Sequence, residues 1–282
     1  PAQQEGGGAV KRSNLPNIIL FIVCAALSLL VLTPVAMIAV NSLKNSRESA
    51  LFGLNLPKDF VWKNYAFVLS KPAVVRGFLN TILIAVAAVL VTNVSAAMAA
   101  YIIQRRPGKI SRAVYYTFLL GLVIPVSIIP TIRLMMNLHL HNTYQGIILY
   151  FIAVNLPFTI FLFAGFMSSV PKEMDEAAMM EGCGRLRMFF QIILPLLSTV
   201  FVTSTIVVAI AVWDDFLGPF YLISDYKKWT IVLNIYSFVS QYETNWGVVF
   251  AFLMRVMAPI LALYFALQRH IISGVTAGSV KG

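Results

Sequence analysis

Charged residues are scarce in this 282-residue chain. They make up 11% of it, against roughly 25% in an average soluble domain, whereas 59% of the residues are hydrophobic. There are only two cysteines: Cys24 lies in a long apolar run and Cys183 in a polar segment, so we expect neither a disulfide framework nor a metal cluster. The sequence also lacks H-E-x-x-H and G-x-S-x-G motifs and a set of paired carboxylates, which argues against a membrane enzyme.

What the sequence does contain is long apolar runs, and a helix needs roughly 20 such residues to cross about 30 Å of hydrocarbon. Lipid offers the backbone no hydrogen-bond partners, and these runs lack the alternation of barrel strands, so we expect helices. The predicted spans are Ile18–Val40, Phe78–Ile103, Val114–Ile132, Ile147–Phe166, Leu196–Val212 and Val248–Leu267. The predicted fold class is therefore an all-α integral membrane protein with six transmembrane helices.

These spans divide the chain into four parts. Residues 1–17 are predicted to be a flexible cytoplasmic tail, 18–77 the first span with a periplasmic loop, 78–267 the core transmembrane domain, and 268–282 a cytoplasmic C-terminal tail. The first apolar run is longer than the roughly 7–15 residues of a signal-peptide core, so we interpret it as an anchor.

The distribution of cations favours cytoplasmic N- and C-termini. With that orientation the inside segments hold eleven Lys and Arg residues and the outside segments nine. The clearest contribution is the short connection that carries Arg105, Arg106, Lys109 and Arg112, because short cytoplasmic loops collect positive charge. We expect the protein in the inner membrane.

The most informative polar segment runs from Pro171 to Pro195. Pro171 and the carboxylates that follow it favour a helix start, because negative charge complements the helix N-terminus. Gly182 and Gly184 predict a turn, and a second helix is expected over Leu186–Leu194, until Pro195 interrupts its hydrogen bonding. Small side chains on the first helix would let the groove of another protein approach closely. The alternative is an ordinary surface hairpin.

The same segment carries a family resemblance. Glu176-Ala177-Ala178 is followed by Gly182 and then by Ile192, Leu194 and Pro195. This matches every fixed position of the EAA signature of ABC-importer permeases, which is EAA, three residues, G, nine residues, I-x-L-P. Seven fixed positions at fixed spacing make this a specific signal.

Further motifs resemble the maltose-transporter MalG-like family of carbohydrate permeases. They are Asn142-Thr143-Tyr144, Asn155-Leu156-Pro157, Trp213-Asp214-Asp215-Phe216, Trp246-Gly247 and the ending Gly274-Val275-Thr276-Ala277-Gly278-Ser279-Val280-Lys281-Gly282. The resemblance covers roughly residues 60–282. It implies a MetI-like permease fold, a second related permease, two ATP-binding-cassette ATPase subunits, and an extracytoplasmic solute-binding protein that delivers a carbohydrate. It implies no nucleic-acid partner.

By this resemblance the segment 171–195 holds the coupling helices. The residues expected to contact the ATPase are Asp175, Glu176, Ala177, Ala178, Gly182, Thr276 and Lys281. The chain lacks a Walker A motif, so ATP and Mg are expected on the partner ATPase subunits, and no cofactor is expected on this chain.

One cation interrupts the sixth predicted span. An arginine near the middle of a span costs between about 2.5 and 17 kcal/mol unless it faces a cavity or a partner. Arg255, with Arg133, is therefore a candidate for lining the pathway and binding an acidic, uronate-type oligosaccharide. The alternative is an ion pair with Asp214 or Asp215, or snorkelling into a crevice. Asn155, Asp214 and Asp215 complete the set of candidate pathway residues.

A secondary transporter or channel for a polar solute is the alternative function. Such a protein would need intramembrane carboxylates for ion coupling or an internal repeat. The predicted spans contain no acidic residue, and no convincing self-similarity is found. The sequence therefore favours the importer permease.

Overall fold

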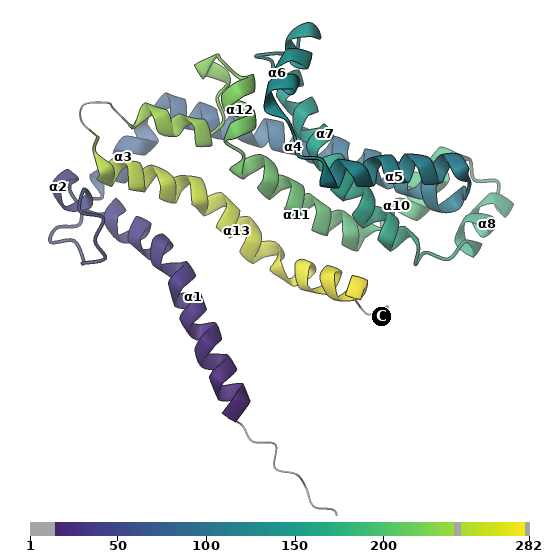
Figure 1. Cartoon of the computed structure of the whole chain (residues 1–282), viewed down its shortest axis with the longest axis horizontal. Coiled ribbons are helices and arrows are strands. Elements are labelled where there is room, and N and C mark those ends of the chain that lie inside the picture. The colour runs from purple at the N-terminus through teal and green to yellow at the C-terminus, as the bar shows by residue number, and fades with distance from the viewer. Residues whose placement is uncertain (1–14, 240–243, 280–282) are drawn as a thin grey trace, which may run out of the picture.

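The computed structural model describes residues 15–239 and 244–279, and within those residues every regular element is a helix. The helices form an elongated bundle, with α8 (Glu173–Met180) at one end and α2 (Ser46–Ser49) and α3 (Lys63–Ser70) at the other (Figure 1). The N-terminal residues 1–14, which include most of the expected flexible tail, lie outside the described residues.

Four helices in the described residues are long and apolar enough to cross a membrane. They are α1 (Leu15–Ser42), α4 (Pro72–Arg105), α7 (Tyr144–Met167) and α13 (Trp246–Ser279). A fifth span results if Arg185–Leu196 and α11 (Ser198–Asp214), which meet at a bend of 78°, are counted together. Five of the six predicted spans fall on these helices, so the all-α membrane fold is confirmed.

The prediction of one continuous helix over Val114–Ile132 is wrong. The structure has α5 (Lys109–Val123), a break, and then α6 (Ile128–Asn137). Ile124 is extended, with φ −79° and ψ 118°, because the ring of Pro125 disfavours helical backbone in the residue before it. With 15 residues at about 1.5 Å each, α5 is too short to cross the hydrocarbon alone.

The last helix is longer than the predicted sixth span. α13 continues to Ser279, so the expected boundary at residue 268 does not coincide with a helix end, and residues 280–282 lie outside the described part. The short elements α12 (Leu217–Leu222), η2 (Tyr226–Lys228) and η3 (Val232–Ser237) connect α11 to α13.

The core of the bundle is built around α4, which packs against α7 and α11. Ala88, Thr92, Ala96 and Ala100 recur every four residues, and each is completely buried. Small side chains on one helical face let neighbouring backbones approach closely in lipid, where packing replaces the hydrophobic effect as the force between helices. These four residues therefore form the packing face of α4.

A buried polar cluster joins α4 to α11. The Asn93 side chain donates a hydrogen bond to Thr205 Oγ1 at 2.8 Å, and Ser204 Oγ donates to Asn93 Oδ1 at 2.9 Å. Asn93 and Ser204 are fully buried. Hydrogen bonds between helices in an apolar environment fix the register of the two helices, so α4 and α11 are held together near the middle of their length.

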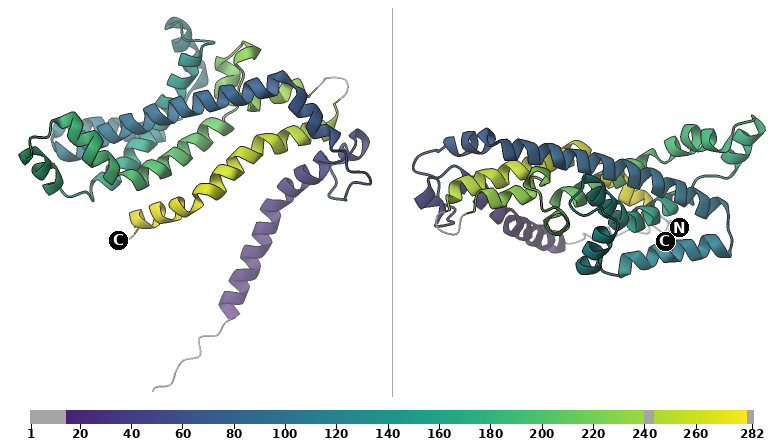
Figure 2. Two further views of the ribbon diagram at one scale, coloured as in Figure 1. Left: turned by 180° about the vertical axis from the view of Figure 1, so that it is seen from behind. Right: turned by 90° about the horizontal axis from the view of Figure 1, so that it is seen from above.

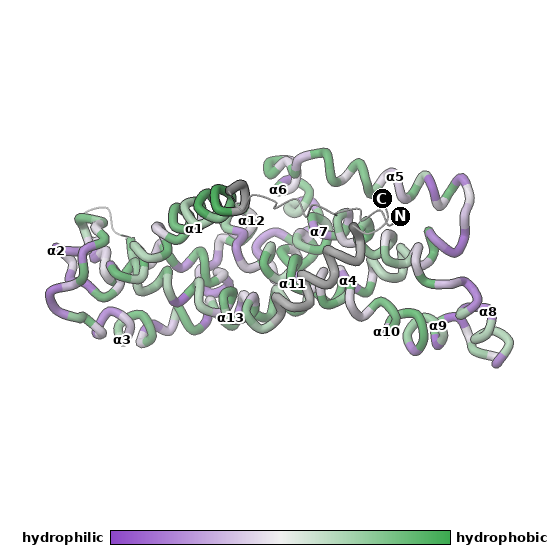
Figure 3. Tube along the Cα trace, turned by 90° about the horizontal axis from the view of Figure 1, so that it is seen from below, coloured by the Kyte–Doolittle hydropathy of each residue, from purple (hydrophilic) through white to green (hydrophobic). Residues whose placement is uncertain are grey.

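α1 contacts α13 near its C-terminal end, and its N-terminal part stands away from the other helices (Figure 2). None of its most apolar stretch is buried within the chain. Polar stretches gather at the two ends of the molecule, around α2 and α3 and around α8 (Figure 3). The long helices between these ends are mostly apolar. The long axis of the bundle therefore runs across the membrane.

The N-terminus of α7 depends on a glycine. A Cβ at Gly146 would meet the carbonyl oxygen of Leu140, whereas a Cβ at Gly165 in the same helix would meet nothing within 4 Å. We expect Gly146→Ala to lower the free energy of unfolding by about 1–3 kcal/mol, because backbone atoms must move to make room. Thermal unfolding of the detergent-solubilised protein measures the change. Gly165→Ala is the control, and an equal loss of stability in both variants would contradict this account.

Candidate functional site

The segment that carries the sequence signature forms a short helix at one end of the molecule. α8 spans Glu173–Met180 and has Glu173, Asp175 and Glu176 in its first turn, close to the predicted start at Pro171. Met180 is 89% exposed and Met179 55% exposed, so the helix presents an uncovered face to its surroundings.

A Schellman motif ends α8. Gly182 has a φ of +76°, the amide of Cys183 donates to the carbonyl of Ala178 at 3.0 Å, and the amide of Gly182 donates to the carbonyl of Met179 at 3.0 Å. Glycine populates this left-handed region without strain, which is why the helix stops here. The turn predicted at Gly182 is confirmed.

A charged side chain fastens α8 to the end of α4. Arg105 Nε donates to Asp175 Oδ2 at 2.9 Å, and Arg105 Nη2 donates to Asp175 Oδ1 at 3.2 Å. The guanidinium also donates to the carbonyls of Val170 and Pro171, and the Tyr101 hydroxyl donates to Asp175 Oδ2 at 3.1 Å. Asp175 is 6% exposed. This bidentate pair joins residues 70 positions apart in the sequence.

The signature residues divide between two faces of α8. Asp175 and Ala178 point into the molecule, and Ala178 is 4% exposed within an apolar cluster formed by α4, α7, α11 and residues 188–197. Glu176, Ala177 and Gly182 are exposed. Contact with a partner is therefore open to Glu176, Ala177 and Gly182, while Asp175 and Ala178 hold the helix in place.

The structure describes less of the two C-terminal residues that were expected to contact the ATPase. Thr276 lies in the last turns of α13, where only the backbone is described, and Lys281 lies outside the described residues.

Tyr101 and Arg105 were not predicted from the sequence as site residues. Their spacing of four puts them on one face of α4, and Arg105 belongs to the cationic connection. Neither of these sequence features identifies Asp175 as the partner.

The chain returns from α8 to the membrane through a distorted helix. α9 (Arg185–Met188) leads into the π-helical segment η1 (Phe189–Ile193) and then α10 (Leu194–Leu196). The predicted end of this helix at Leu194 is two residues early, since Pro195 sits in the first turn of α10 where its missing amide is tolerated. The direction changes by 78° between Leu196 and Ser198.

The two arginines proposed for the pathway are exposed. Arg133 lies on α6, and Arg255 lies on α13 with its guanidinium 5.6 Å from the centre of the Phe78 ring. The only salt bridge among the described residues is the one between Arg105 and Asp175. The alternative ion pair of Arg255 with Asp214 or Asp215 is therefore not formed in the described part of the chain, where Arg255 makes a cation–π contact with Phe78.

The remaining pathway candidates differ in their surroundings. Asn155 donates to the Phe151 carbonyl of its own helix, and Asp214 is exposed at the end of α11. Asp215 Oδ1 accepts hydrogen bonds from the amides of Leu217 and Gly218 and so caps α12. Burial raises the pKa of the Asp215 carboxyl, and these two amide bonds oppose the rise. No hydrogen bond or ion pair joins any two of the five candidates in the part of the chain that is described.

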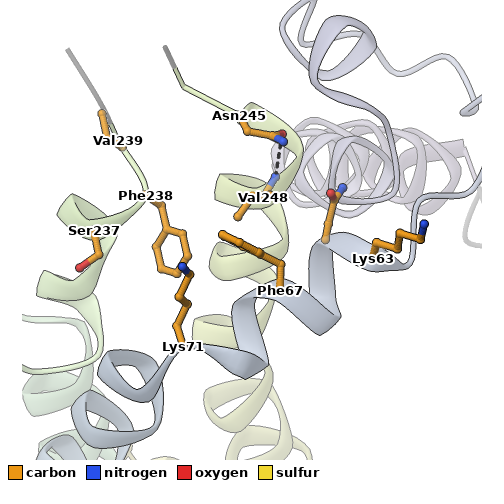
Figure 4. A pocket seen from close by; sticks show the side chains of 9 residues that line it. Lys63, Phe67, Lys71, Ser237, Phe238, Val239, Asn245 and Val248 are labelled. Carbon is orange, nitrogen blue, oxygen red and sulfur yellow. Dashed lines mark hydrogen bonds between the residues drawn. The ribbon is translucent and has the colours of Figure 1, made fainter. Parts of the chain in front are cut away.

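The opposite end of the molecule holds a cavity of about 520 Å³ between α3, η3 and the start of α13 (Figure 4). Lys63, Phe67 and Lys71 line it from one side, and Phe238 and Val248 from the other. The ammonium of Lys71 lies 4.3 Å from the centre of the Phe67 ring. Cations and aromatic rings thus gather at the end of the bundle farthest from α8.

Comparison with known proteins begins with a family model. Residues 93–277 match the family described as "Binding-protein-dependent transport system inner membrane component". This range contains α8, the salt bridge to Arg105, and all five pathway candidates.

Several curated proteins are similar along most of their length. The probable starch degradation products transport system permease protein AmyC of Thermoanaerobacterium thermosulfurigenes is 30% identical, over 96% of this chain and all of that protein. The diacetylchitobiose uptake system permease protein NgcG of Streptomyces coelicolor is 32% identical, over 90% and 85%. The melibiose/raffinose/stachyose import permease protein MelC of Bacillus subtilis is 31% identical, over 80% and 83%.

A solved structure has the same fold. It is a chain of a bacterial ABC transporter involved in the import of the acidic polysaccharide alginate, with a TM-score of 0.81 and 20% sequence identity. The similarity covers 93% of this chain and 99% of the other. The arrangement of helices is therefore shared over almost the whole length.

Breaking the tie between α8 and α4 tests how α8 is held. Asp175→Ala leaves the guanidinium of Arg105 largely buried without its carboxylate, a loss of roughly 3–5 kcal/mol for a buried pair. We expect hydrogen exchange of the α8 amides to accelerate at least about tenfold, because local opening becomes easier. Mass spectrometry of deuterium uptake over residues 173–180 measures it. Glu173→Ala removes an exposed carboxylate from the same turn, and equal acceleration in that control would refute the role of Asp175.

Proposed function

The chain belongs to the family of binding-protein-dependent transport system inner membrane components, and we propose that it forms one half of the membrane pathway of an ATP-driven oligosaccharide importer. Members of this family are the multi-pass membrane permeases of transport systems. The membrane fold and the similarity to sugar permeases favour this function over a secondary transporter. The ATPase activity of such a system resides on other subunits.

The observation that carries the proposal is the geometry of α8. A helix of eight residues has little stability of its own, yet α8 is fixed by Asp175 on its inner face and by the Gly182 turn at its end. Its outer face presents Glu176, Ala177 and Met180 without cover. A short, firmly held helix that protrudes in this way suits the groove of an ATPase subunit.

Motion of α8 would be transmitted to the membrane helices by two routes. The Arg105–Asp175 pair leads to α4, and the segment from α9 to α10 leads to α11. When ATP and Mg draw the two ATPase subunits together, α8 moves with them. The bundle then alternates between openings to the inside and to the outside.

The partner set follows from the same family. The proposal requires two ATPase subunits, a solute-binding protein and a second permease chain beside this one. The apolar stretch of α1 is 0% buried within the chain, so lipid or the second permease must cover it. We place α8 and both chain ends on the cytoplasmic side of the membrane. α2 and α3 then face the binding protein on the other side.

The substrate class rests on the relatives and on one side chain. The relatives named above carry different oligosaccharides by their names, so we propose an oligosaccharide here. Arg255 is exposed and has no carboxylate partner within the described residues. If it faces the pathway, its guanidinium suits a sugar carboxylate, and the proposed solute is an acidic oligosaccharide.

Charge reversal on α8 tests the docking role. We expect Glu176→Lys to lower ATP-driven uptake at least about tenfold, because a reversed charge at the rim of an interface opposes association. Uptake in proteoliposomes and co-purification of the ATPase measure the effect. Glu48→Lys, the same reversal on α2 at the other end, is the control for co-purification of the ATPase, which it should leave unchanged. Normal uptake and normal ATPase retention in Glu176→Lys would rule out this docking surface.

Removal of the exposed membrane cation tests the substrate class. We expect Arg255→Ala to raise the KM for a uronate oligosaccharide about tenfold, as loss of a charge-assisted hydrogen bond predicts, and to leave uptake of a neutral oligosaccharide unchanged. Arg255→Lys, which keeps the charge, is the matched variant and should retain most of the affinity. Unchanged KM for the acidic sugar in Arg255→Ala would exclude the acidic-sugar proposal while leaving the importer function intact.

A further inference from the structure

A second cavity, of about 500 Å³, opens between the end of α4, α8 and α9. It lies where the apolar run of α4 gives way to the cationic connection that starts at Arg105. One half of its wall is basic, with Arg106, Lys172 and Arg185, and the other half is apolar, with Met98, Met179 and Leu186. The cavity is therefore amphipathic and sits at the level of the membrane surface.

The basic half carries charge that the chain does not neutralise. Arg105 also lines the cavity, but its donors are used by Asp175 and two carbonyls. Arg106, Lys172 and Arg185 are exposed, and their side chains form no hydrogen bond or ion pair within the described residues. Only one further carboxylate, that of Glu176, faces them across the cavity. The site thus has an excess of positive charge that attracts an anion.

The apolar half continues along the span. Leu90 and Met98 are 51% and 36% exposed and follow one another along α4, and Ile102, 52% exposed, carries this exposed stripe to the cavity wall. Leu186 at the cavity is 67% exposed. An occupant with a long apolar chain would cover this stripe, whereas a small soluble anion would leave it bare.

We propose that this cavity binds an anionic phospholipid. Arg106, Lys172 and Arg185 hold the phosphate by charge-assisted hydrogen bonds, and an acyl chain lies over Met98 and the exposed stripe of α4. Because the same cavity is bounded by Glu176 and Met179 of α8, the lipid stabilises the base of the element proposed to meet the ATPase. The lipid site depends on membrane insertion and not on which solute is transported.

The test is lipid binding to the intact importer, the chain with its partner subunits, in detergent. Native mass spectrometry follows titration with phosphatidylglycerol and, separately, with phosphatidylcholine of the same acyl chains. We expect one phosphatidylglycerol to bind preferentially, and the double variant Arg106→Gln/Arg185→Gln to bind it about thirtyfold more weakly, since two cations near the headgroup are lost. Arg112→Gln, from the same cationic connection but outside the cavity wall, should bind like the unmodified protein.

Four results would overturn the site. Equal binding of phosphatidylcholine, or an equal loss in Arg112→Gln, would indicate a non-specific lipid belt. Full competition by glycerol phosphate would indicate a soluble anion instead of a lipid. Capture of a partner subunit, and no lipid, by a photoreactive residue at Leu186 would assign the cavity to a protein interface.

Discussion

The ion pair between Arg105 and Asp175 is the constraint on which the position of α8 depends. Eight residues are too few for a helix to persist alone in water, so α8 needs tertiary contacts to stay folded. The pair supplies them from a distant part of the chain, with every hydrogen bond of the guanidinium going to Asp175 in α8 or to the two carbonyls just before α8. Tyr101 adds a donor to the same carboxylate. Without this cluster, only the packing of Ala178 and the turn at Gly182 would hold the exposed face of α8 in its direction.

The two connections of α8 converge on one rigid unit inside the membrane. One connection enters α4 at Arg105, and the other enters α11 through the π-helical segment η1 and the 78° bend. Asn93, Ser204 and Thr205 then join α4 to α11 by buried hydrogen bonds. We therefore propose that displacement of α8 is applied to both helices together, as rigid-body switching requires.

Local features of the sequence predicted much of this. Long apolar runs placed five spans, the acidic first turn placed the start of α8, and Gly182 marked its end, because each of these depends on neighbouring residues. Hydropathy alone did not register the break after Val123, although Pro125 was there to indicate it. The inward direction of Asp175 and the contact of Arg255 with Phe78 depend on residues far apart in the sequence, and no local pattern encodes such pairs.

The central claim is that the outer face of α8 meets the motor of the importer. Met180 is the most exposed large side chain of that face, so a photoreactive residue in its place reports on whatever lies there in the assembled complex. The account predicts that irradiation captures an ATPase subunit, while the same residue at Phe60, in the loop at the opposite end, does not. Capture of the solute-binding protein from position 180, or of the ATPase from position 60, would contradict it.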